Sequence, residues 1–179
     1  MAERFESLDD KHIEFIKQQH LFFISTAAAD GTVNLSPKGM DCLQVINPNQ
    51  AVWLNLTGSG NETAAHLLKV NRMTLMFCSF DRQPLILRLY GSANTIHPRD
   101  EKWASYLKLM PDFVGARQFF ELNIDMVQTS CGYGVPYYEF KEDRRTLTKW
   151  AEKKGRSGVE AYWDEENQLS LDGFKTEII

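Results

Sequence analysis

The chain begins with short apolar segments joined by turns that are too short to hold a helix. Residues 21–28, 33–38, 43–46 and 51–56 follow one another with only four residues in each gap. Parallel strands need a crossover connection of a dozen residues or more, so these segments can pair only in antiparallel fashion if they form one sheet. The first half of the chain therefore predicts an antiparallel meander rather than a βαβ fold.

Three later segments extend this pattern, at residues 72–80, 85–96 and 119–128. The last of these alternates, which predicts that Phe120, Leu122, Ile124 and Met126 share one face and that the acidic and amide side chains between them share the other. Asp30-Gly31 predicts a hairpin turn with positive φ at both positions. Seven antiparallel strands are enough to close a small β-barrel and remove its edges.

Helices are predicted around this sheet. Residues 7–19 have helical spacing after a weak capping box at Ser7, and Ser59 with Glu62 predicts a capping box before a second short helix. A third helix is expected from about 98 to 110, and a charged helical segment from about 144 to 179. No repeat or linker interrupts the chain, so residues 1–179 are expected to form a single domain.

Composition excludes several classes of protein. Twenty basic and 24 acidic residues give a net charge of −4, which disfavours a non-specific nucleic-acid binder. No stretch approaches the roughly 18 apolar residues of a membrane span, and the acidic start is unlike a secretory signal. Three scattered cysteines and four histidines predict neither a disulfide framework nor a metal site. We expect a soluble, cytoplasmic protein without a nucleic-acid or membrane partner.

Two segments combine small residues with groups that could hold an anion. Ser36-Pro37-Lys38-Gly39 ends a strand with a lysine whose charge could reach a pocket mouth, although a solvated edge strand would have the same sequence. Residues 57–63 place small residues before a helix N-terminus, which can bind phosphate. An ordinary capped helix after a glycine turn explains that segment equally well, and it has neither P-loop nor GxGxxG spacing.

A third segment, residues 131–138, follows the last predicted strand with two glycines, a proline and several aromatic residues. Such a loop could lie against a flat aromatic ligand, because rings stack and glycines let the backbone approach closely. A dimer contact or a plain surface loop remains an alternative. No histidine is placed to activate Cys131 as a nucleophile.

Taken in order, residues 33–39, 53–59, 73–77 and 87–91 resemble the pyridoxamine 5'-phosphate oxidase-like flavoproteins. The closing Cys-Gly-Tyr-Gly-Val-Pro at 131–136 looks like a branch of that superfamily described only as flavin-nucleotide-binding proteins. The resemblance implies a mainly β fold with peripheral helices, the split β-barrel. It also implies a homodimer with one FMN in each of two clefts at the subunit interface.

Position by position, Lys38 matches the family lysine that faces the flavin phosphate or ring edge. The family's basic phosphate-binding pair is replaced here by Gly60-Asn61, so the phosphate would rely on Lys38, helix N–H groups and nearby hydroxyl and amide side chains. Ile86 stands where the oxidase has a polar flavin contact. The residues expected to bind FMN are Ser36, Pro37, Lys38, Gly39, Asn55, Leu56, Thr57, Gly58, Ser59, Asn61, Thr63, Arg88, Cys131, Gly132 and Tyr133.

The function expected from this resemblance is electron transfer through FMN between NAD(P)H, or a small organic substrate, and an acceptor. The oxidase's C-terminal Trp-x-Arg-Leu is absent, so pyridoxamine phosphate is not the expected substrate. No residue is identified as a general acid or base. The alternatives are a non-catalytic FMN carrier or sensor, and a haem- or other small-ligand-binding relative whose axial ligand would be His66 or Cys131.

Overall fold

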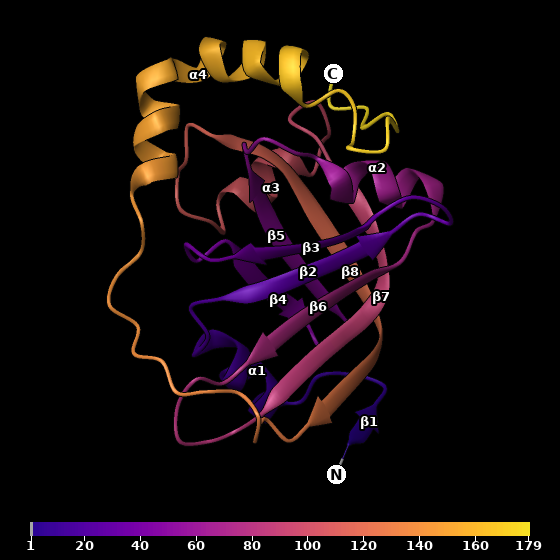
Figure 1. Cartoon of the computed structure of the whole chain (residues 1–179), viewed down its shortest axis with the longest axis vertical. Coiled ribbons are helices and arrows are strands. Elements are labelled where there is room, and N and C mark those ends of the chain that lie inside the picture. Colours follow the sequence, from indigo (N-terminus) through magenta and orange to yellow (C-terminus); the bar gives the residue numbers. More distant parts are fainter. Residues whose placement is uncertain (1) are drawn as a thin grey trace.

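The computed structural model describes residues 2–179 as one antiparallel sheet of eight strands with four helices around it (Figure 1). The fold is mainly β, as predicted. The strand count is one higher than expected, because residues Glu3–Phe5 near the N-terminus also pair with the sheet. The elements are β1 (Glu3–Phe5), α1 (Asp10–Lys17), β2 (Phe22–Ala27), β3 (Val33–Lys38), β4 (Leu43–Asn47), β5 (Gln50–Leu56), α2 (Glu62–Lys69), β6 (Met73–Cys78), β7 (Ile86–Ile96), α3 (Trp103–Leu107), β8 (Ala116–Ser130) and α4 (Thr146–Glu166).

The hydrogen-bonded order of the strands is β3-β2-β6-β7-β8-β5-β4, and β1 pairs with the far end of β8. Within the described residues, β3 and β4 stand at the two ends of this path, so the sheet keeps two edges where the sequence predicted none. The inward faces form the main core around Trp53, Leu75, Phe77 and Phe120. Antiparallel pairing brings Leu56, at the end of β5, opposite Ala116, at the start of β8.

The alternation predicted for 119–128 holds only as far as Ile124. Gly91 pairs with Ile124 whereas Tyr90 pairs with Met126, so Asp125 is an extra residue in β8. This bulge reverses the phase, and Val127 rather than Met126 is buried beyond it. Gly91 is required there, because a Cβ atom would lie 1.8 Å from the Asn123 carbonyl oxygen.

Two of the predicted turn and cap signals act differently in the structure. The hairpin between β2 and β3 has positive φ at Gly31 but not at Asp30. The first helix begins later than predicted, since Asp9 rather than Ser7 forms the N-cap and His12 completes the capping box. The later helix start reflects which local side chain reaches the free N–H groups of the first turn.

The other helices also differ in extent. The predicted helix over 98–110 contracts to α3, although Met110 is buried and Trp103 and Tyr106 pack against the same core cluster. The C-terminal segment is helical only in α4, which kinks at Gly155, where φ is +68°. Residues 167–179 then run in irregular turns toward α2 (Figure 1).

The C-terminal segment is firmly attached to the barrel. Trp163 is buried and donates its indole N–H to the Thr57 hydroxyl over 2.8 Å. Trp163 and Ile178 join Ala151 and Val159 in a small core cluster of their own. Asp172 accepts hydrogen bonds from the backbone and hydroxyl of Thr32. The segment therefore closes one end of the barrel near the start of α2.

Candidate functional site: a cationic cavity between β3, β5 and α2

A cavity of about 280 Å³ lies where the ends of β3 and β5 meet the start of α2. It gathers eight of the residues expected to bind a cofactor, six from the first two predicted segments and two, Asn55 and Leu56, from the end of β5. It also includes residues that the sequence analysis did not select, from β3 and from the start of β8. The lining is Asn34, Ser36, Lys38, Asn55, Leu56, Gly58, Ser59, Gly60, Asn61, Glu62, Thr63 and Arg117.

Lys38 supplies the first positive charge of the cavity. It is the last residue of β3 and is half-buried, with its ammonium group 5.5 Å from the centre of the Trp53 ring. Burial, reinforced by repulsion from Arg117, lowers the pKa of Lys38 to about 8. The ammonium group is thus poorly solvated, and a nearby anion would stabilise it.

Arg117 supplies the second positive charge, and it is almost completely buried at 2% exposure. Its guanidinium group donates to Asn167 Oδ1 over 2.6 Å and to the carbonyl oxygen of Gly60 over 3.0 Å, with a longer contact of 3.5 Å to the Gly58 carbonyl. All three acceptors are neutral, and burial lowers the pKa of Arg117 to about 9.

No ion pair involving Lys38 or Arg117 occurs among residues 2–179. Buried cations are ordinarily paired, because an uncompensated charge in a protein interior is costly. Glu62, also in the lining, directs its carboxylate to the backbone N–H of Leu171. The cavity therefore has the electrostatic character of an anion site.

The start of α2 adds hydrogen-bond donors. Asn61 occupies the N-cap position, yet its side chain makes no capping bond, so the expected capping box of Ser59 and Glu62 is wrong. Asn61 is 2% exposed, and both polar atoms of its amide lack a partner within the described chain. The first-turn N–H groups of a helix have no intrahelical acceptor. These donors fit a phosphate group, and they complement the two cations.

A hydrogen-bonded network fixes the opposite wall. Asn34 donates to the hydroxyl oxygens of Thr26 and Thr63, each over 3.2 Å, and accepts from Ser36 over 2.8 Å. His66 is fully buried behind this network, with Nδ1 3.2 Å from the Thr26 hydroxyl. Thr63 is therefore held facing the cavity by residues of the neighbouring strands.

Other predicted site residues lie outside this cavity. Thr57 uses its hydroxyl to donate to Gly115 and to accept from Trp163. Gly39 lines a different cavity of about 210 Å³, and Pro37 is exposed on β3. Arg88 donates to Ser130 near the far end of β8.

The predicted aromatic loop is also remote within this chain. Cys131, Gly132 and Tyr133 follow the end of β8, and Tyr133 is 82% exposed. The start of β8 borders the cavity, so the strand's 15 residues separate the two places by a path of roughly 50 Å at about 3.3 Å per residue.

A second cavity, of about 450 Å³, adjoins the first. Gly58 and Ser59 line both cavities, and α4 supplies Leu147, Trp150 and Tyr162 to the second. Its character is mainly apolar and aromatic, with Arg144 as its charged member. Trp150 thus lines a cavity, whereas Trp163 packs in a core cluster.

Sequence reasoning missed Arg117 and Asn167. A signal for Arg117 exists, because Arg117-Gln118 interrupts an apolar stretch directly before two phenylalanines. No local pattern marks Asn167, which reaches the site only because α4 folds back over the barrel.

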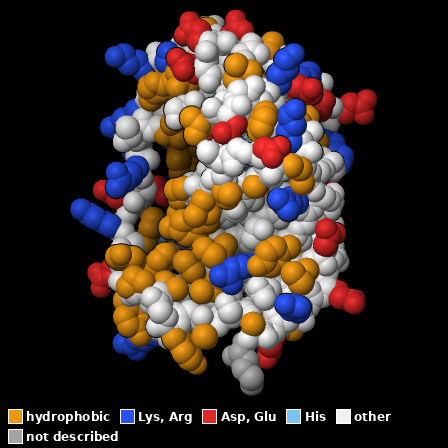
Figure 2. All heavy atoms as spheres, turned by 45° about the vertical axis from the view of Figure 1, so that its right-hand side comes forward, with side chains coloured by type: hydrophobic (Ala, Val, Ile, Leu, Met, Phe, Trp, Pro, Cys, Tyr) orange, Lys and Arg blue, Asp and Glu red, His pale blue; other side chains and the backbone are white. Residues whose placement is uncertain are grey.

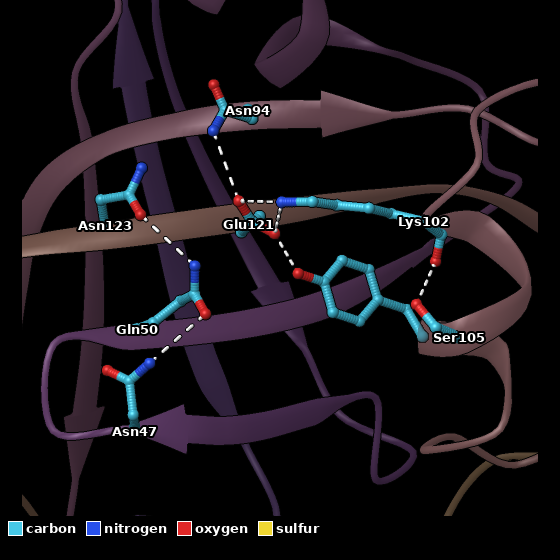
Figure 3. A network of polar contacts seen from close by, with 8 residues as sticks. Asn47, Gln50, Asn94, Lys102, Ser105, Glu121 and Asn123 are labelled. Carbon is cyan, nitrogen blue, oxygen red and sulfur yellow. Dashed lines mark hydrogen bonds and ion pairs between the residues drawn. The ribbon is translucent and has the colours of Figure 1, made fainter.

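A contrasting charged cluster lies on the opposite side of β8 from the main core. Glu121 is 2% exposed, and it accepts from Asn94, from Lys102 over 2.9 Å and from the Tyr106 hydroxyl (Figure 3). Burial alone would raise the pKa of Glu121, but these hydrogen bonds outweigh it and lower that pKa. Burial and the bond to Glu121 raise the pKa of Tyr106 to about 12.

The antiparallel sheet, with a cationic cavity between β3, β5 and α2, defines a split-barrel protein. Residues 8–131 match the model of the pyridoxamine 5'-phosphate oxidase family, and this is more than half of the chain. The chain therefore belongs to that family. It is 38% identical to the pyridoxamine 5'-phosphate oxidase family protein ustO of Aspergillus flavus, in an alignment that covers 94% of this chain and 75% of the relative.

Solved structures share the fold at lower identity. A Lactobacillus delbrueckii protein with the provisional name pyridoxamine 5'-phosphate oxidase matches with a TM-score of 0.56 and 21% identity, over 69% of this chain and 94% of its own. The FAD binding protein of Mycobacterium smegmatis matches with a TM-score of 0.52 and 15% identity, over 69% and 96%. HutZ, the heme storage protein of Vibrio cholerae, matches with a TM-score of 0.51 and 16% identity, over 70% and 97%.

The family match ends at residue 131, so α4 and the turns after it lie beyond the matched domain. Among residues 2–179, no helix is long and apolar enough to cross a membrane.

Proposed function

We propose that this protein is an FMN-binding flavoprotein of the oxidoreductase type, with the flavin phosphate held in the cationic cavity. One observation carries the proposal. Two poorly solvated cations, Lys38 and Arg117, line one cavity beside the amide of Asn61, and within residues 2–179 the cations have no carboxylate partner and the amide has no hydrogen-bond partner. A phosphate dianion would satisfy all of these groups at once, because it offers several strong acceptors and a compensating charge.

Each residue then has a definite task. Arg117 and Lys38 neutralise the phosphate, the N–H groups at the start of α2 donate to it, and Thr63 and Ser59 offer hydroxyl groups at the wall. When bound, the flavin supplies the hydride and electron transfer that these side chains cannot perform. The adjoining aromatic cavity, lined by Trp150 and Tyr162, is suited to a flat organic molecule. NAD(P)H or such a molecule is the proposed electron donor.

We propose a homodimer as the functional unit. Val33 and Leu35 on the edge strand β3 are 72% and 64% exposed, and Tyr137 and Phe140 are also exposed after β8. Figure 2 shows hydrophobic side chains gathered along a hollowed side of the molecule. Exposed apolar surface of this kind favours association. A second copy could also supply Arg88 and the loop at Cys131–Tyr133, which this chain holds away from its own cavity.

The observations favour flavin over haem. An axial haem ligand must present an accessible nitrogen or sulfur atom. Of the two candidates, His66 is a fully buried residue of α2 and Cys131 lies on the loop after β8. Neither lines the cationic cavity.

The absorption spectrum of the protein as isolated tests the proposal. Flavin bands, with FMN as the nucleotide released on denaturation, are the expected result. Release of FAD would overturn the choice of FMN as the bound nucleotide. A Soret band, or failure of the apoprotein to bind added flavin, would overturn the proposal as a whole. NADPH oxidation measured on the reconstituted protein then separates an enzyme from a carrier, because a carrier binds FMN without turnover.

Lys38→Ala provides the residue-level test. The substitution removes one of the two positive charges proposed to contact the phosphate. FMN affinity should therefore fall by about tenfold, the equivalent of one lost charged hydrogen bond. Lys69→Ala, at the exposed end of α2, is the matched control because it removes the same charge outside the cavity. Equal FMN affinity in the two variants would remove Lys38 from the site.

A further inference from the structure

Asn167 stands at the end of α4, outside the family-matched domain, and its side chain contacts two residues that line the cationic cavity, Arg117 and Gly58. It is fully buried, and its Oδ1 atom accepts the 2.6 Å hydrogen bond from Arg117. Its Nδ2 atom donates to the Gly58 carbonyl oxygen over 3.0 Å. One amide thus joins the guanidinium group to the loop that forms the cavity wall.

The backbone of Asn167 is itself held in place. Its N–H donates to the Trp163 carbonyl, and its carbonyl oxygen accepts from the Thr176 hydroxyl over 2.6 Å. Trp163 is buried and bonded to Thr57. Since a positioned acceptor must not move relative to its donor, these contacts give Asn167 the rigidity that orientation of Arg117 requires.

The chemical type of this residue matters as much as its position. A carboxylate is the usual partner of a buried arginine, and it would neutralise the guanidinium charge. An amide accepts the same hydrogen bond and leaves the charge intact. Arg117 Nε has no partner in the described chain, so donor capacity also remains.

We infer that Asn167 is a positioning residue that orients Arg117 toward the phosphate of the bound nucleotide while keeping its positive charge available. The inference rests on the proposed function, and it adds that the C-terminal segment completes the phosphate site. Binding of the phosphate and docking of the C-terminal segment are then linked, because each stabilises the same orientation of Arg117.

The test compares FMN with riboflavin, which lacks the phosphate, in titrations of the apoprotein. Asn167→Asp places a carboxylate against Arg117. This carboxylate would neutralise the guanidinium charge and repel the FMN phosphate, so FMN affinity should fall by about thirtyfold or more. Riboflavin affinity should change by less than about twofold, because no phosphate contact is involved. A structural role alone would weaken both ligands equally, and that result would overturn the inference.

Gln168→Glu is the matched control. It introduces the same negative charge at the next residue, whose side chain is exposed and bonds to Asp164. The ratio of FMN to riboflavin affinity should remain at the wild-type value. A fall as large as that of Asn167→Asp would show that charge near the segment, rather than the contact to Arg117, is responsible.

Two further measurements keep the inference testable. If Asn167→Asp does not fold, Asn167→Ala must still weaken FMN selectively, by about tenfold for the loss of an orienting bond. If wild-type protein binds neither flavin, the proposed function fails. The inference is then tested with inorganic phosphate, which should raise the thermal midpoint of wild-type protein and not that of Asn167→Asp. Equal midpoint shifts would refute it.

Discussion

Two regions only four residues apart on the same strand, β8, each bury a charged side chain, and they treat it differently. Glu121, near the middle of β8, is surrounded by a lysine, a tyrosine hydroxyl and an amide that satisfy its charge (Figure 3). Arg117, at the start of β8, is equally buried but contacts only neutral acceptors.

On the proposed function, the difference separates a structural charge from a charge held for a ligand. The Glu121 cluster needs nothing further, and its bonds attach α3 to the sheet. The Arg117 site carries an electrostatic cost in the ligand-free protein, and on the same proposal a bound anion would offset that cost. The absence of a partner is thus more informative about function than burial itself.

The largest expected effect is on the satisfied charge. Glu121→Leu should lower the free energy of unfolding by about 3 kcal/mol, because it removes the acceptor of a buried hydrogen-bonded cluster. Chemical denaturation followed by fluorescence measures this loss. FMN affinity should stay within about twofold of wild type, since the cluster does not line the cavity. A stability unchanged by Glu121→Leu would erase the contrast between the two regions.

The reciprocal experiment removes the unsatisfied charge. Arg117→Met should weaken FMN binding by about a hundredfold, because charge-assisted bonds to the phosphate are lost. The ligand-free protein should change in stability by less than about 1 kcal/mol, because relief of an unpaired buried cation offsets the lost hydrogen bonds. Flavin titration and denaturation of the apoprotein check the two parts. Strong destabilisation with intact FMN affinity would make Arg117 a structural residue.

The two regions should also respond to pH in different ranges, with stability rising as pH rises in both. The pKa of Glu121 is lowered in the folded state, so its stabilisation is present above the unfolded value of 4.5 and is lost as pH falls through the folded value. The pKa of Lys38 is lowered from 10.5 to about 8, so the unfolded chain binds more protons between these values. The contribution of Lys38 to the stability of the ligand-free protein therefore increases as pH rises from about 8 to 10.5.

FMN affinity should fall over the same range, because Lys38 loses its positive charge above about pH 8. Titrations from pH 6.5 to 9.5 should reveal the decline in wild-type protein and a flatter profile in Lys38→Met. Identical profiles for the two proteins would contradict the assignment of Lys38.

The smallest expected effect, that of Lys102→Met on stability, serves as a comparison for Glu121→Leu. Lys102 pairs with Glu121, but its side chain is 57% exposed. Lys102→Met should therefore cost less than about 1 kcal/mol, as exposed ion pairs usually do. Denaturation midpoints compared with Glu121→Leu measure the difference. Equal losses in the two variants would assign the energy to the ion pair rather than to the buried acceptor.

Much of the fold was predictable because its signals are local. Short gaps between apolar segments require antiparallel pairing, and alternation correctly placed Phe120 and Leu122 in the core. The phase error at Met126 has a long-range cause, since the bulge at Asp125 depends on how β8 meets Gly91 on β7. The capping box of Ser59 and Glu62 failed for a similar reason, as the Glu62 carboxylate accepts instead from Leu171, 109 residues away.

The residues of the site also divide into those with a local sequence signal and those placed by long-range contacts. Lys38, Ser59, Asn61 and Thr63 lie together in the cavity, and each belongs to a segment whose small residues and strand or helix ends are visible in the sequence. Family order, carried by local motifs, was enough to select them. The proposed phosphate contacts of these residues remain predictions.

The sequence by itself determined the antiparallel barrel, the family and one cation of the cavity, because these depend on neighbours along the chain. Only the tertiary structure decided that Arg117 is the second cation and that Asn167 accepts its hydrogen bond. The pairing of Leu56 with Ala116 and the return of α4 over the barrel bring together groups that are 50 residues apart in the chain. Whether a buried charge is balanced depends on everything that surrounds it in space, and no local pattern contains that information.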